Sequence, residues 1–408
     1  MRVGVVGSGG REHALAHVLG RTAEVMVTPG NPGIPGSTDV PPEELDVDLV
    51  VVGPEAALVG GVADRVRAHG IPVYGPGGDG AHLEGSKAWM KEVVARAGVP
   101  TARYGAFSDV GRALDFLRSL EGPWVVKTDG LAAGKGVLVT DSLIDAEDDV
   151  KAKLAGASFG DAGRTVVIEE GLLGPELSVL AVCDGRTAVA LAPAQDFKRA
   201  RDGDAGPNTG GMGAYSPVPV APPELVDDVL DRFVEPTLFE LRRRGIDYRG
   251  TLYAGLMLTP DGPKLLEYNV RFGDPEAQVV LPRLDDDLAD LLAAAAAGEL
   301  GGRSPRFVAD AAVCVVLATP GYPEDPRGGG VIDGIDDACA VPGVEVFHAG
   351  VAKVDGRPLV TAGGRVLDVV GFGATIADAR ATAYEAVHRI TWPGMHFRSD
   401  IAKEASKR

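Results

Sequence analysis

The 408-residue sequence contains only three cysteines, and they form no pattern. Cys183, Cys314 and Cys339 lie far apart among apolar or small residues, so neither metal-ligand spacing nor a paired disulfide framework is present. No targeting segment is expected at the start, because MRVGVVGSGG is typical of a strand and a turn. We therefore expect a protein of the reducing cytoplasm.

Long apolar runs and an excess of positive charge are also missing. The longest apolar stretch, Leu288–Ala297, is alanine-rich, is interrupted by Asp290 and is too short to cross a bilayer. The formal net charge is −18, and a surface of that sign repels nucleic acid and anionic membranes. We expect small-molecule partners, no nucleic-acid or membrane partner, and a monomer.

Strands and helices are expected to alternate over the first 100 residues. The expected strands cover 2–6, 24–28, 48–52 and 72–74, and the expected helices cover 11–19 and 58–69. This alternation predicts an α/β fold that begins with a parallel, doubly wound sheet.

The chain changes character after Gly98-Val99-Pro100. Strands expected at 124–127, 136–140, 165–169 and 177–183, with helices at 110–119 and 143–155, predict a small lid built on one antiparallel sheet. A helix at 223–244 and two strands follow, and the last hundred residues carry strands at 311–317, 345–349 and 366–372 and a helix at 376–390. We therefore expect domains at 1–100, 101–309 (lid about 122–190) and 310–408.

The turn Gly7-Ser8-Gly9-Gly10 follows the first strand and opens a helix. Backbone N–H groups and the helix dipole favour an anion at such a turn. A dinucleotide fingerprint needs glycine or alanine at its third position, where this chain has Glu12. A single phosphate is therefore favoured over a dinucleotide, with a merely tight turn as the alternative.

Lys127 ends an expected strand and is followed by a loop of small residues, Gly130–Gly136, that carries Lys135. Strand alternation puts Lys127 on the face opposite Trp124 and Val126. The loop is not a P-loop, because no Ser or Thr follows its lysine. The pattern indicates a lid that closes over phosphates, with a surface hairpin as the alternative.

Three polar residues, Glu267, Asn269 and Arg271, share one face of an expected strand. A carboxylate and a carboxamide two residues apart can hold Mg²⁺, with phosphate and water completing the shell. Arg271 then lies where it can stabilise charge on a transferring phosphoryl group. A simple polar sheet face is the alternative.

Two further polar segments suit substrate binding. The pair Glu169-Glu170 at a strand end suits an adenine hinge, with Glu176 on the ribose hydroxyls, although paired acids are more often solvated. In the long loop that follows, Asp196 can accept hydrogen bonds from a substrate ammonium. The pair Gly210-Gly211 lets the backbone approach a carboxylate or phosphate, and the loop's length favours function over a plain surface loop.

Taken in order, these segments resemble the phosphoribosylamine–glycine ligase family of the ATP-grasp superfamily. The matching stretches are GSGGREHA (7–14), PGNPG (29–33), VVGPEAALVGG (51–61), LEGSKAWMK (83–91), PWVVKTDGLAAGKGV (123–137), EEGLLGPELS (169–178), PAQDFKR (193–199), GPNTGGMGAYSP (206–217), LLEYNVRFGDPEAQ (265–278) and VVLATPGYP (315–323). Phe197 stands where the family often has histidine, which we expect to change packing rather than chemistry.

The resemblance implies an ATP-grasp fold with a parallel-sheet pre-ATP-grasp N-terminal domain, an antiparallel-sheet lid and a small C-terminal domain. The implied reaction, in de novo purine biosynthesis, joins glycine to 5-phosphoribosylamine through a glycyl phosphate, giving glycinamide ribonucleotide, ADP and phosphate.

The resemblance also implies site residues. Those for ATP are Lys87, Lys127, Gly130, Lys135, Gly136, Glu169, Glu170, Leu172 and Glu176. Those for the other substrates are Gly9, Gly10, Asn31, Glu55, Asp196, Lys198, Gly210 and Gly211. The implied ligands of Mg²⁺ or Mn²⁺ are Glu267 and Asn269, and the implied catalytic residues are Arg271, Lys127 and Asp196.

Two alternatives stay open. One is another ATP-grasp ligase, against which the stretch from PAQDFKR to GPNTGGMG argues. The other is a nucleotide-binding dehydrogenase or sensor built on the first glycine turn, against which Glu12 and the Glu267/Asn269 pair argue. No Ser or Cys lies in a nucleophile-elbow motif, so covalent catalysis by a side chain is not expected.

Overall fold

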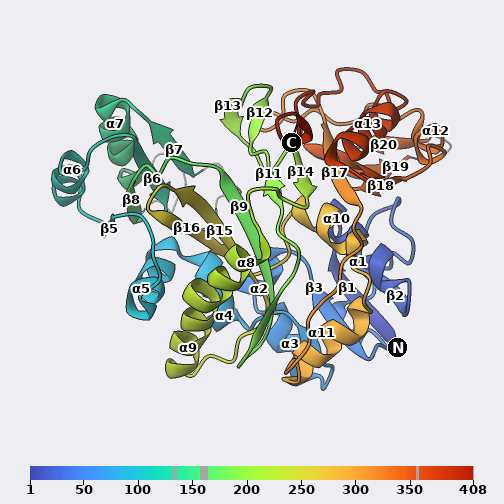
Figure 1. The fold of residues 1–408 in the computed structure, drawn as a ribbon, viewed down its shortest axis with the longest axis horizontal. Coiled ribbons are helices and arrows are strands. Elements are labelled where there is room, and N and C mark those ends of the chain that lie inside the picture. Colours follow the sequence, from blue (N-terminus) through green and yellow to red (C-terminus); the bar gives the residue numbers. More distant parts are fainter. Residues whose placement is uncertain (132–135, 157–163, 355–357, 408) are drawn as a thin grey trace.

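The computed structural model describes residues 1–131, 136–156, 164–354 and 358–407. Its N-terminal unit is a parallel sheet in the order β2-β1-β3-β4 with helices packed on it (Figure 1). The elements are β1 Arg2–Gly7, α1 Gly10–Leu19, β2 Glu24–Pro29, β3 Leu49–Val52, α2 Glu55–Val59, α3 Val62–Ala68, β4 Val73–Tyr74, α4 Gly78–Gly85 and α5 Lys87–Ala97. The predicted doubly wound start is thus confirmed, and β3 is apolar and buried throughout, as a sheet covered on both faces requires.

The helix expected at 58–69 is two helices. α2 ends at Val59 and α3 begins at Val62, with Gly60 and Gly61 between them. Gly61 has a φ of +74°, a left-handed conformation that ends a helix and that glycine adopts without strain.

The lid is an antiparallel sheet in the order β5-β8-β6-β7, with two helices packed on it. Its elements are β5 Tyr104–Phe107, α6 Val110–Arg118, β6 Trp124–Thr128, β7 Val137–Thr140, α7 Leu143–Leu154 and β8 Val166–Glu170. A small core of its own, centred on Val126 and Ile168, lies apart from the larger cores of the molecule. Figure 1 shows the lid projecting from the rest of the chain.

The expectation that 177–183 belongs to the lid sheet is wrong. This segment, β9 Glu176–Asp184, pairs instead with β15 Arg249–Thr259 in a separate sheet of order β10-β9-β15-β16. The other strands of this body sheet are β10 Ala188–Ala190 and β16 Gly262–Asn269. The lid sheet is completed by β5, which precedes the expected start of the lid. Periodicity identifies a strand but does not choose its partner, which explains the error.

The helical elements of the body confirm the long helix predicted at 223–244. It consists of α8 Pro223–Val229, a π-helical segment Leu230–Val234 and α9 Glu235–Arg243. The alanine-rich stretch is a core helix, α11 Leu288–Ala297, and α10 Glu276–Val280 precedes it. Among the described residues, no helix combines the length and apolar character needed to cross a membrane.

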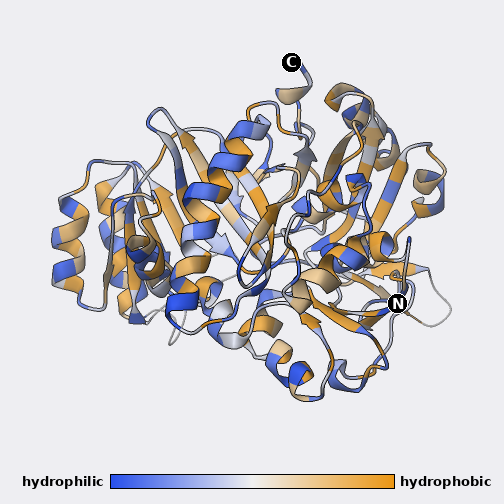
Figure 2. Cartoon of the chain, turned by 60° about the horizontal axis from the view of Figure 1, so that its bottom comes forward, coloured by the Kyte–Doolittle hydropathy of each residue, from blue (hydrophilic) through white to orange (hydrophobic). Residues whose placement is uncertain are grey.

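A five-stranded sheet, ordered β11-β14-β17-β21-β18, joins the long middle loop to the last hundred residues. Its strands are β11 Gln195–Asp196, β14 Gly213–Ser216, β17 Ala311–Ala318, β18 Val344–His348 and β21 Arg365–Gly373. Around it lie the hairpins β12 Arg199–Arg201/β13 Ala205–Asn208 and β19 Val351–Lys353/β20 Leu359–Thr361, and the helices α12 Ile335–Cys339 and α13 Ile376–Val387. In Figure 2 hydrophobic colouring predominates along the strands in the interior of the molecule, and the helices around them show both hydrophobic and hydrophilic residues.

Candidate active site

One cavity of about 1400 Å³ lies between the lid, the body sheet and the C-terminal unit. Its lining brings together most of the residues predicted from the sequence: Lys87, Lys127, Gly136, Glu169, Glu170, Leu172, Glu176, Glu55, Asp196, Lys198, Gly210, Glu267, Asn269 and Arg271. Gly9, Gly10, Asn31, Gly130 and Gly211 are described but do not line it. Lys135 lies outside the described residues.

The end of β16 presents the predicted polar face to the cavity. Glu267, Asn269 and Arg271 all line it, and Arg271 Nη2 donates a hydrogen bond to Asn269 Oδ1 at 3.1 Å. Strict strand alternation predicts Leu266 on the face opposite Glu267, but Leu266 also lines the cavity. A bulge leaves Leu266 without a partner in β15, so it lines the cavity while Leu265 enters the core.

Glu267 is the side chain most suited to a cation. Burial opposes its charged form, but Lys127, Lys198, Lys87 and Arg271 outweigh burial and lower its pKa. Within the described ranges its carboxylate forms no hydrogen bond or ion pair, so both oxygens are available to a ligand.

One wall of the cavity carries a lysine cluster, which we define as Lys87, Lys91 and Lys127 near Glu169. Lys127 Nζ lies 2.8 Å from Glu169 Oε1, and Lys91 Nζ lies 3.1 Å from Glu169 Oε2. Lys87 Nζ donates to the Gly130 carbonyl at 2.9 Å, which ties α5 to the loop after β6. Trp124 and Val126 pack into the lid core, so the predicted orientation of Lys127 is confirmed.

Burial and pairing act against each other in the lysine cluster. Burial lowers the pKa of Lys91 to about 8 despite Glu169 beside it. It also lowers the pKa of Lys87, with Glu267 opposing it. For Lys127 burial acts in the same direction, but Glu169 and Glu267 outweigh it and the pKa is raised. Glu169 thus favours the charged forms of Lys91 and Lys127, whereas Glu267 favours the charged forms of all three lysines.

The opposite wall carries an arginine cluster, which we define as Arg11, Arg271 and Arg365. Arg271 Nη2 lies 2.9 Å from Glu84 Oε1, and its Nε lies 3.3 Å from Glu55 Oε2. Burial opposes the charged form of Arg271, but Glu84 and Glu55 raise its pKa. The guanidinium is therefore charged and held in place from several directions.

Arg11 explains why the first glycine turn is closed. Its Nε lies 2.6 Å from Glu12 Oε1, and the other oxygen of Glu12 accepts the Gly9 N–H at 2.7 Å. The anion at this helix N-terminus is therefore the chain's own Glu12. That this turn binds a phosphate stays a prediction. The Gly9 N–H cannot donate to a phosphate while it donates to Glu12.

Arg365 joins the C-terminal sheet to the loop after β16. Its Nη2 lies 2.9 Å from Asp274 Oδ2, and its Nη1 donates to the carbonyls of Gly210 at 2.6 Å and Asp274 at 2.8 Å. Gly211 has a φ of +113° and a Cβ there would overlap the Pro275 ring, so this position requires glycine. The sequence predicted that the backbone at Gly210-Gly211 approaches a carboxylate or phosphate. In the structure this backbone lies close to other protein groups, Arg365 and Pro275.

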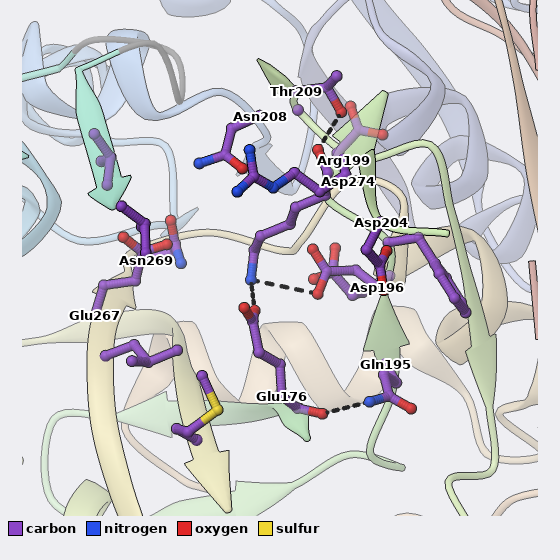
Figure 3. A pocket seen from close by; sticks show the side chains of 18 of the residues that line it. Glu176, Gln195, Asp196, Arg199, Asp204, Asn208, Thr209, Glu267, Asn269 and Asp274 are labelled. Atoms are coloured by element: carbon purple, nitrogen blue, oxygen red, sulfur yellow. Dashed lines mark hydrogen bonds and ion pairs between the residues drawn. The ribbon is translucent and has the colours of Figure 1, made fainter. Parts of the chain in front are cut away.

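A third set of charges lies between the two clusters. Lys198 Nζ contacts Glu176 and lies 3.4 Å from Asp196 Oδ1 (Figure 3). Burial raises the pKa of Asp196 to about 7, with Lys198 opposing it. Figure 3 shows Glu267 and Asn269 across the cavity from Asp196. Groups suited to a substrate ammonium and to a cation therefore face each other.

Two residues predicted to face a substrate are engaged elsewhere. The Asn31 amide donates to the carbonyls of Ser8 at 2.8 Å and Ala349 at 3.1 Å, which joins two loops. Gly10 packs against Asp368, and a Cβ at Gly10 would overlap its carboxylate. Their roles toward a substrate stay predictions.

Sequence reasoning missed Glu84, Lys91, Arg11 and Arg365. The first two lie in the quoted stretch LEGSKAWMK but stood out there only as ordinary helix residues. The sequence offered only an indirect signal: each of these residues is charged and lies in a segment expected to be buried. A buried charge needs a partner, but the sequence does not identify that partner. The partners, Arg271 and Glu169, lie 187 and 78 residues further along.

The fold and the cavity define an ATP-grasp enzyme. Residues 85–277 match the model of the phosphoribosylglycinamide synthetase ATP-grasp (A) domain. The biotin carboxylase domain of 2-oxoglutarate carboxylase from Hydrogenobacter thermophilus has the same fold, with a TM-score of 0.73 at 16% identity over 97% of this chain and 91% of that one.

Residues 1–84 and 312–404 match the N and C domains of the same synthetase. The phosphoribosylamine–glycine ligase of Caulobacter vibrioides is 49% identical over 98% of this chain and 97% of its own length. The crystal structure of the Thermotoga maritima phosphoribosylamine–glycine ligase superposes with a TM-score of 0.85, at 35% identity over 98% of this chain and 100% of that one. The chain belongs to the phosphoribosylamine–glycine ligase family, and it is an ATP-dependent ligase.

The dehydrogenase alternative is thereby contradicted, for two reasons. All three family models are those of a ligase. The first glycine turn is also filled by Glu12, whose carboxylate would overlap a side chain at Gly53 as well. The other alternative, a different ATP-grasp ligase, is contradicted by the family match over the whole chain.

Proposed function

We propose that this chain joins glycine to 5-phosphoribosylamine in the cavity between the lysine and arginine clusters, through a glycyl phosphate. The observation that carries the proposal is the placement of Glu267, Asn269 and Arg271 opposite Asp196 and Lys198 in a single cavity. A carboxylate substrate held there has cations around its reacting oxygens and an acidic partner for its ammonium.

The chemistry needs activation of a poor electrophile. Transfer of the γ-phosphoryl group of ATP to the glycine carboxylate forms an acyl phosphate and ADP. The amine of phosphoribosylamine then attacks the carbonyl carbon, and phosphate leaves with the electrons of the broken C–O bond. Since no side-chain nucleophile is required, the chain contributes mainly positioning and charge stabilisation.

The two clusters divide this work. Lys127 is charged and buried beside the cavity, and Lys87 reaches the loop that follows β6, so we assign both to the ATP phosphates. We assign Arg271 to the transferring phosphoryl group because Glu84 and Glu55 hold its guanidinium in a defined orientation. Asp196 accepts the glycine ammonium, whose charge favours the ionised form of this buried carboxyl.

A divalent cation fits the same wall. The carboxylate of Glu267, which has no partner in the part of the chain that the structure describes, and the carboxamide oxygen of Asn269 are hard oxygen ligands of the kind that Mg²⁺ or Mn²⁺ prefers. When bound, such an ion neutralises phosphate charge. The four cationic side chains that lower the pKa of Glu267 keep this carboxylate ionised for that purpose.

The remaining roles follow the sequence predictions. We propose that Glu169, Glu170, Leu172 and Glu176 border the nucleotide, that Gly130, Lys135 and Gly136 belong to the loop over its phosphates, and that Gly9, Gly10, Asn31 and Glu55 belong to the phosphoribosylamine side. We also propose a cytoplasmic monomer without nucleic-acid partners, divided near residues 100 and 310.

The test is ADP release by the purified protein with Mg-ATP and glycine, with and without phosphoribosylamine generated in situ. We expect release that requires both substrates and fails when alanine replaces glycine. Release that ignores the amine, or that accepts alanine equally, would contradict the proposal. The matched protein control is Glu267→Gln, which keeps the side-chain volume and should abolish release.

A further inference from the structure

The loop that carries Asp196 and Lys198 continues directly into a weakly paired hairpin. Strands β12 and β13 pair at Arg199 with Asn208 and at Arg201 with Ala205, with an irregular register between them, and at the base of the hairpin the Thr209 N–H donates to the Lys198 carbonyl at 2.7 Å. A two-stranded hairpin is at best marginally stable by itself. Its orientation at the edge of the cavity must therefore come from other contacts.

Those contacts come from a tail segment, residues 396–405, which lies against the hairpin (Figure 1). Both segments line the cavity. Three bonds connect the tail to the hairpin backbone or turn: His396 Nε2 with the Ala200 carbonyl at 2.6 Å, the Ser399 N–H with Asp202 Oδ1 at 2.8 Å, and the Gly203 N–H with Asp400 Oδ2 at 2.8 Å.

Arg398 is the centre of this contact and is only 1% exposed. Its Nη1 donates to the Arg199 carbonyl at 3.2 Å and to Asp204 Oδ1 at 2.7 Å. Its Nε and Nη2 donate to the two oxygens of Asp400 at 2.7 and 2.8 Å. The guanidinium also lies 5.0 Å from the centre of the Phe197 ring, within the range of a cation–π contact. Phe197 is the residue between Asp196 and Lys198.

The tail is itself held by α13. Arg380 donates to the carbonyls of Ile401 at 2.9 Å and Ser399 at 2.6 Å, and the Tyr384 hydroxyl donates to the Arg398 carbonyl at 2.6 Å. A continuous series of contacts therefore runs from a helix of the C-terminal unit, through Arg398, to the two neighbours of Lys198, namely the Phe197 ring and the Arg199 carbonyl.

We propose that Arg398 is a positioning residue for the glycine-binding part of the site: it orients the hairpin and Phe197 so that Asp196 and Lys198 point into the cavity. This inference rests on the proposed function, because it assigns the affected step to glycine rather than to ATP. The lysine cluster has no contact with this hairpin or tail in the described residues. Lys198 does contact Glu176, which we place beside the nucleotide, so the glycine side should respond more strongly than the ATP side.

The test compares Arg398→Met with Arg398→Lys. The Met variant keeps the stem length but removes the five donors, and the Lys variant keeps the charge. For Arg398→Met we expect the KM for glycine to rise and kcat to fall, together by about 10- to 100-fold in kcat/KM, as misplacement of a binding group produces. The KM for ATP should change much less than the KM for glycine, and Arg398→Lys should recover part of the loss.

The matched control is Arg283→Met. Arg283 is also buried and hydrogen-bonded, in its case to the Asp310 carbonyl and the Ser216 hydroxyl, but it lies outside the cavity lining. We expect it to lower thermal stability without changing the KM for glycine. Equal changes in the KM for glycine and for ATP in Arg398→Met, or a loss of stability alone, would overturn the inference.

Asp204→Asn keeps the test decisive if Arg398→Met does not fold. The Asp204 side chain is 70% exposed, so its substitution does not threaten the core, but it removes one charged partner of Arg398. We expect a smaller rise in the KM for glycine with no change for ATP, and an unchanged KM for glycine would refute the inference. A wild-type protein without glycine-dependent ADP release would instead refute the proposed function.

Discussion

The two walls of the cavity hold their charges in different ways. On the wall with the lysine cluster, which we call the lysine wall, two ammonium groups share the single carboxylate of Glu169 and the third donates to a loop carbonyl. On the wall with the arginine cluster, which we call the arginine wall, each guanidinium bonds to several groups at once, as Arg271 does to Glu84, Glu55 and Asn269. A guanidinium fork fixes geometry, whereas an ammonium is a point charge that adapts.

The difference matches the parts that each wall joins. Lys127 and Glu169 lie on the lid, which has a separate small core, so their contacts with the body must survive lid movement. The arginine wall joins the N-terminal unit, the loop after β16 and the C-terminal sheet, which pack through shared cores. We infer that nucleotide binding is adaptable and that the transfer site is preorganised.

The largest effect should come from breaking the arginine wall at Arg271. Arg271→Ala should raise the barrier by about 3–4 kcal/mol, the usual cost of removing one group that stabilises transition-state charge, while ATP binding persists. Arg271→Lys should restore little, because a single ammonium cannot contact Glu84, Glu55 and Asn269 together. Steady-state kinetics with a nucleotide-binding assay measures both.

Arg232→Ala is the control for this comparison, since Arg232 pairs with Asp228 on an exposed helix face. Full activity in Arg271→Ala, or full rescue by Arg271→Lys, would show that the arginine wall is not preorganised in the way proposed.

The free energy of unfolding should depend on pH because of the buried Lys91 on the lysine wall. Its folded pKa of about 8 lies below the ordinary value of 10.5, so between these values the unfolded chain binds more protons. The contribution of Lys91 to the free energy of unfolding therefore increases as pH rises through this window, by a total on the order of 3 kcal/mol. Below pH 8 the buried charge is a net cost.

Denaturant unfolding of the wild type and Lys91→Met, from about pH 7 to about pH 10, tests this prediction. The stability difference, wild type minus variant, should become more positive with pH. A difference that is flat, or that falls, would contradict a lowered pKa for Lys91.

A purely steric effect is expected at Gly10, where the arginine wall meets the C-terminal sheet. Gly10→Ala puts a methyl group into the buried Asp368 carboxylate and should destabilise the protein by about 1–3 kcal/mol. Asp368→Ala added to this variant removes the clash and should recover stability relative to Gly10→Ala alone. Thermal unfolding of the single and double variants measures the coupling, and strict additivity would show that the clash is not the cause.

The smallest effect is expected at the outer edge of the lysine wall. Lys264 lies 3.5 Å from Glu170, and both side chains are partly exposed to solvent. Lys264→Ala should change stability by less than about 0.5 kcal/mol and leave the KM for ATP unaltered. A clear rise in this KM would mean that ATP binding depends on the ion pair between Lys264 and Glu170 at the surface.

Much of the local structure was predictable because it depends on neighbours in the chain. Apolar runs such as Leu49–Val52 predict buried strands, and the helix predicted at 376–390 was found as α13 Ile376–Val387. The errors concern partners and interruptions. Nothing within β9 indicates that it pairs with β15 rather than with β8, because that choice is made between segments about 70 residues apart in the chain.

The sequence by itself determined the family, and it predicted residues for ATP, a cation and a carboxylate, because residues that act together on a ligand occur in short motifs. Only the tertiary structure decided which charges are paired. The carboxylate of Glu12 fills its own turn, Lys91 shares Glu169 with Lys127, and Arg398 holds the strand that begins directly after Lys198. Burial makes an unpaired charge costly, and the partner that relieves the cost lies wherever folding brings one, at any distance along the chain.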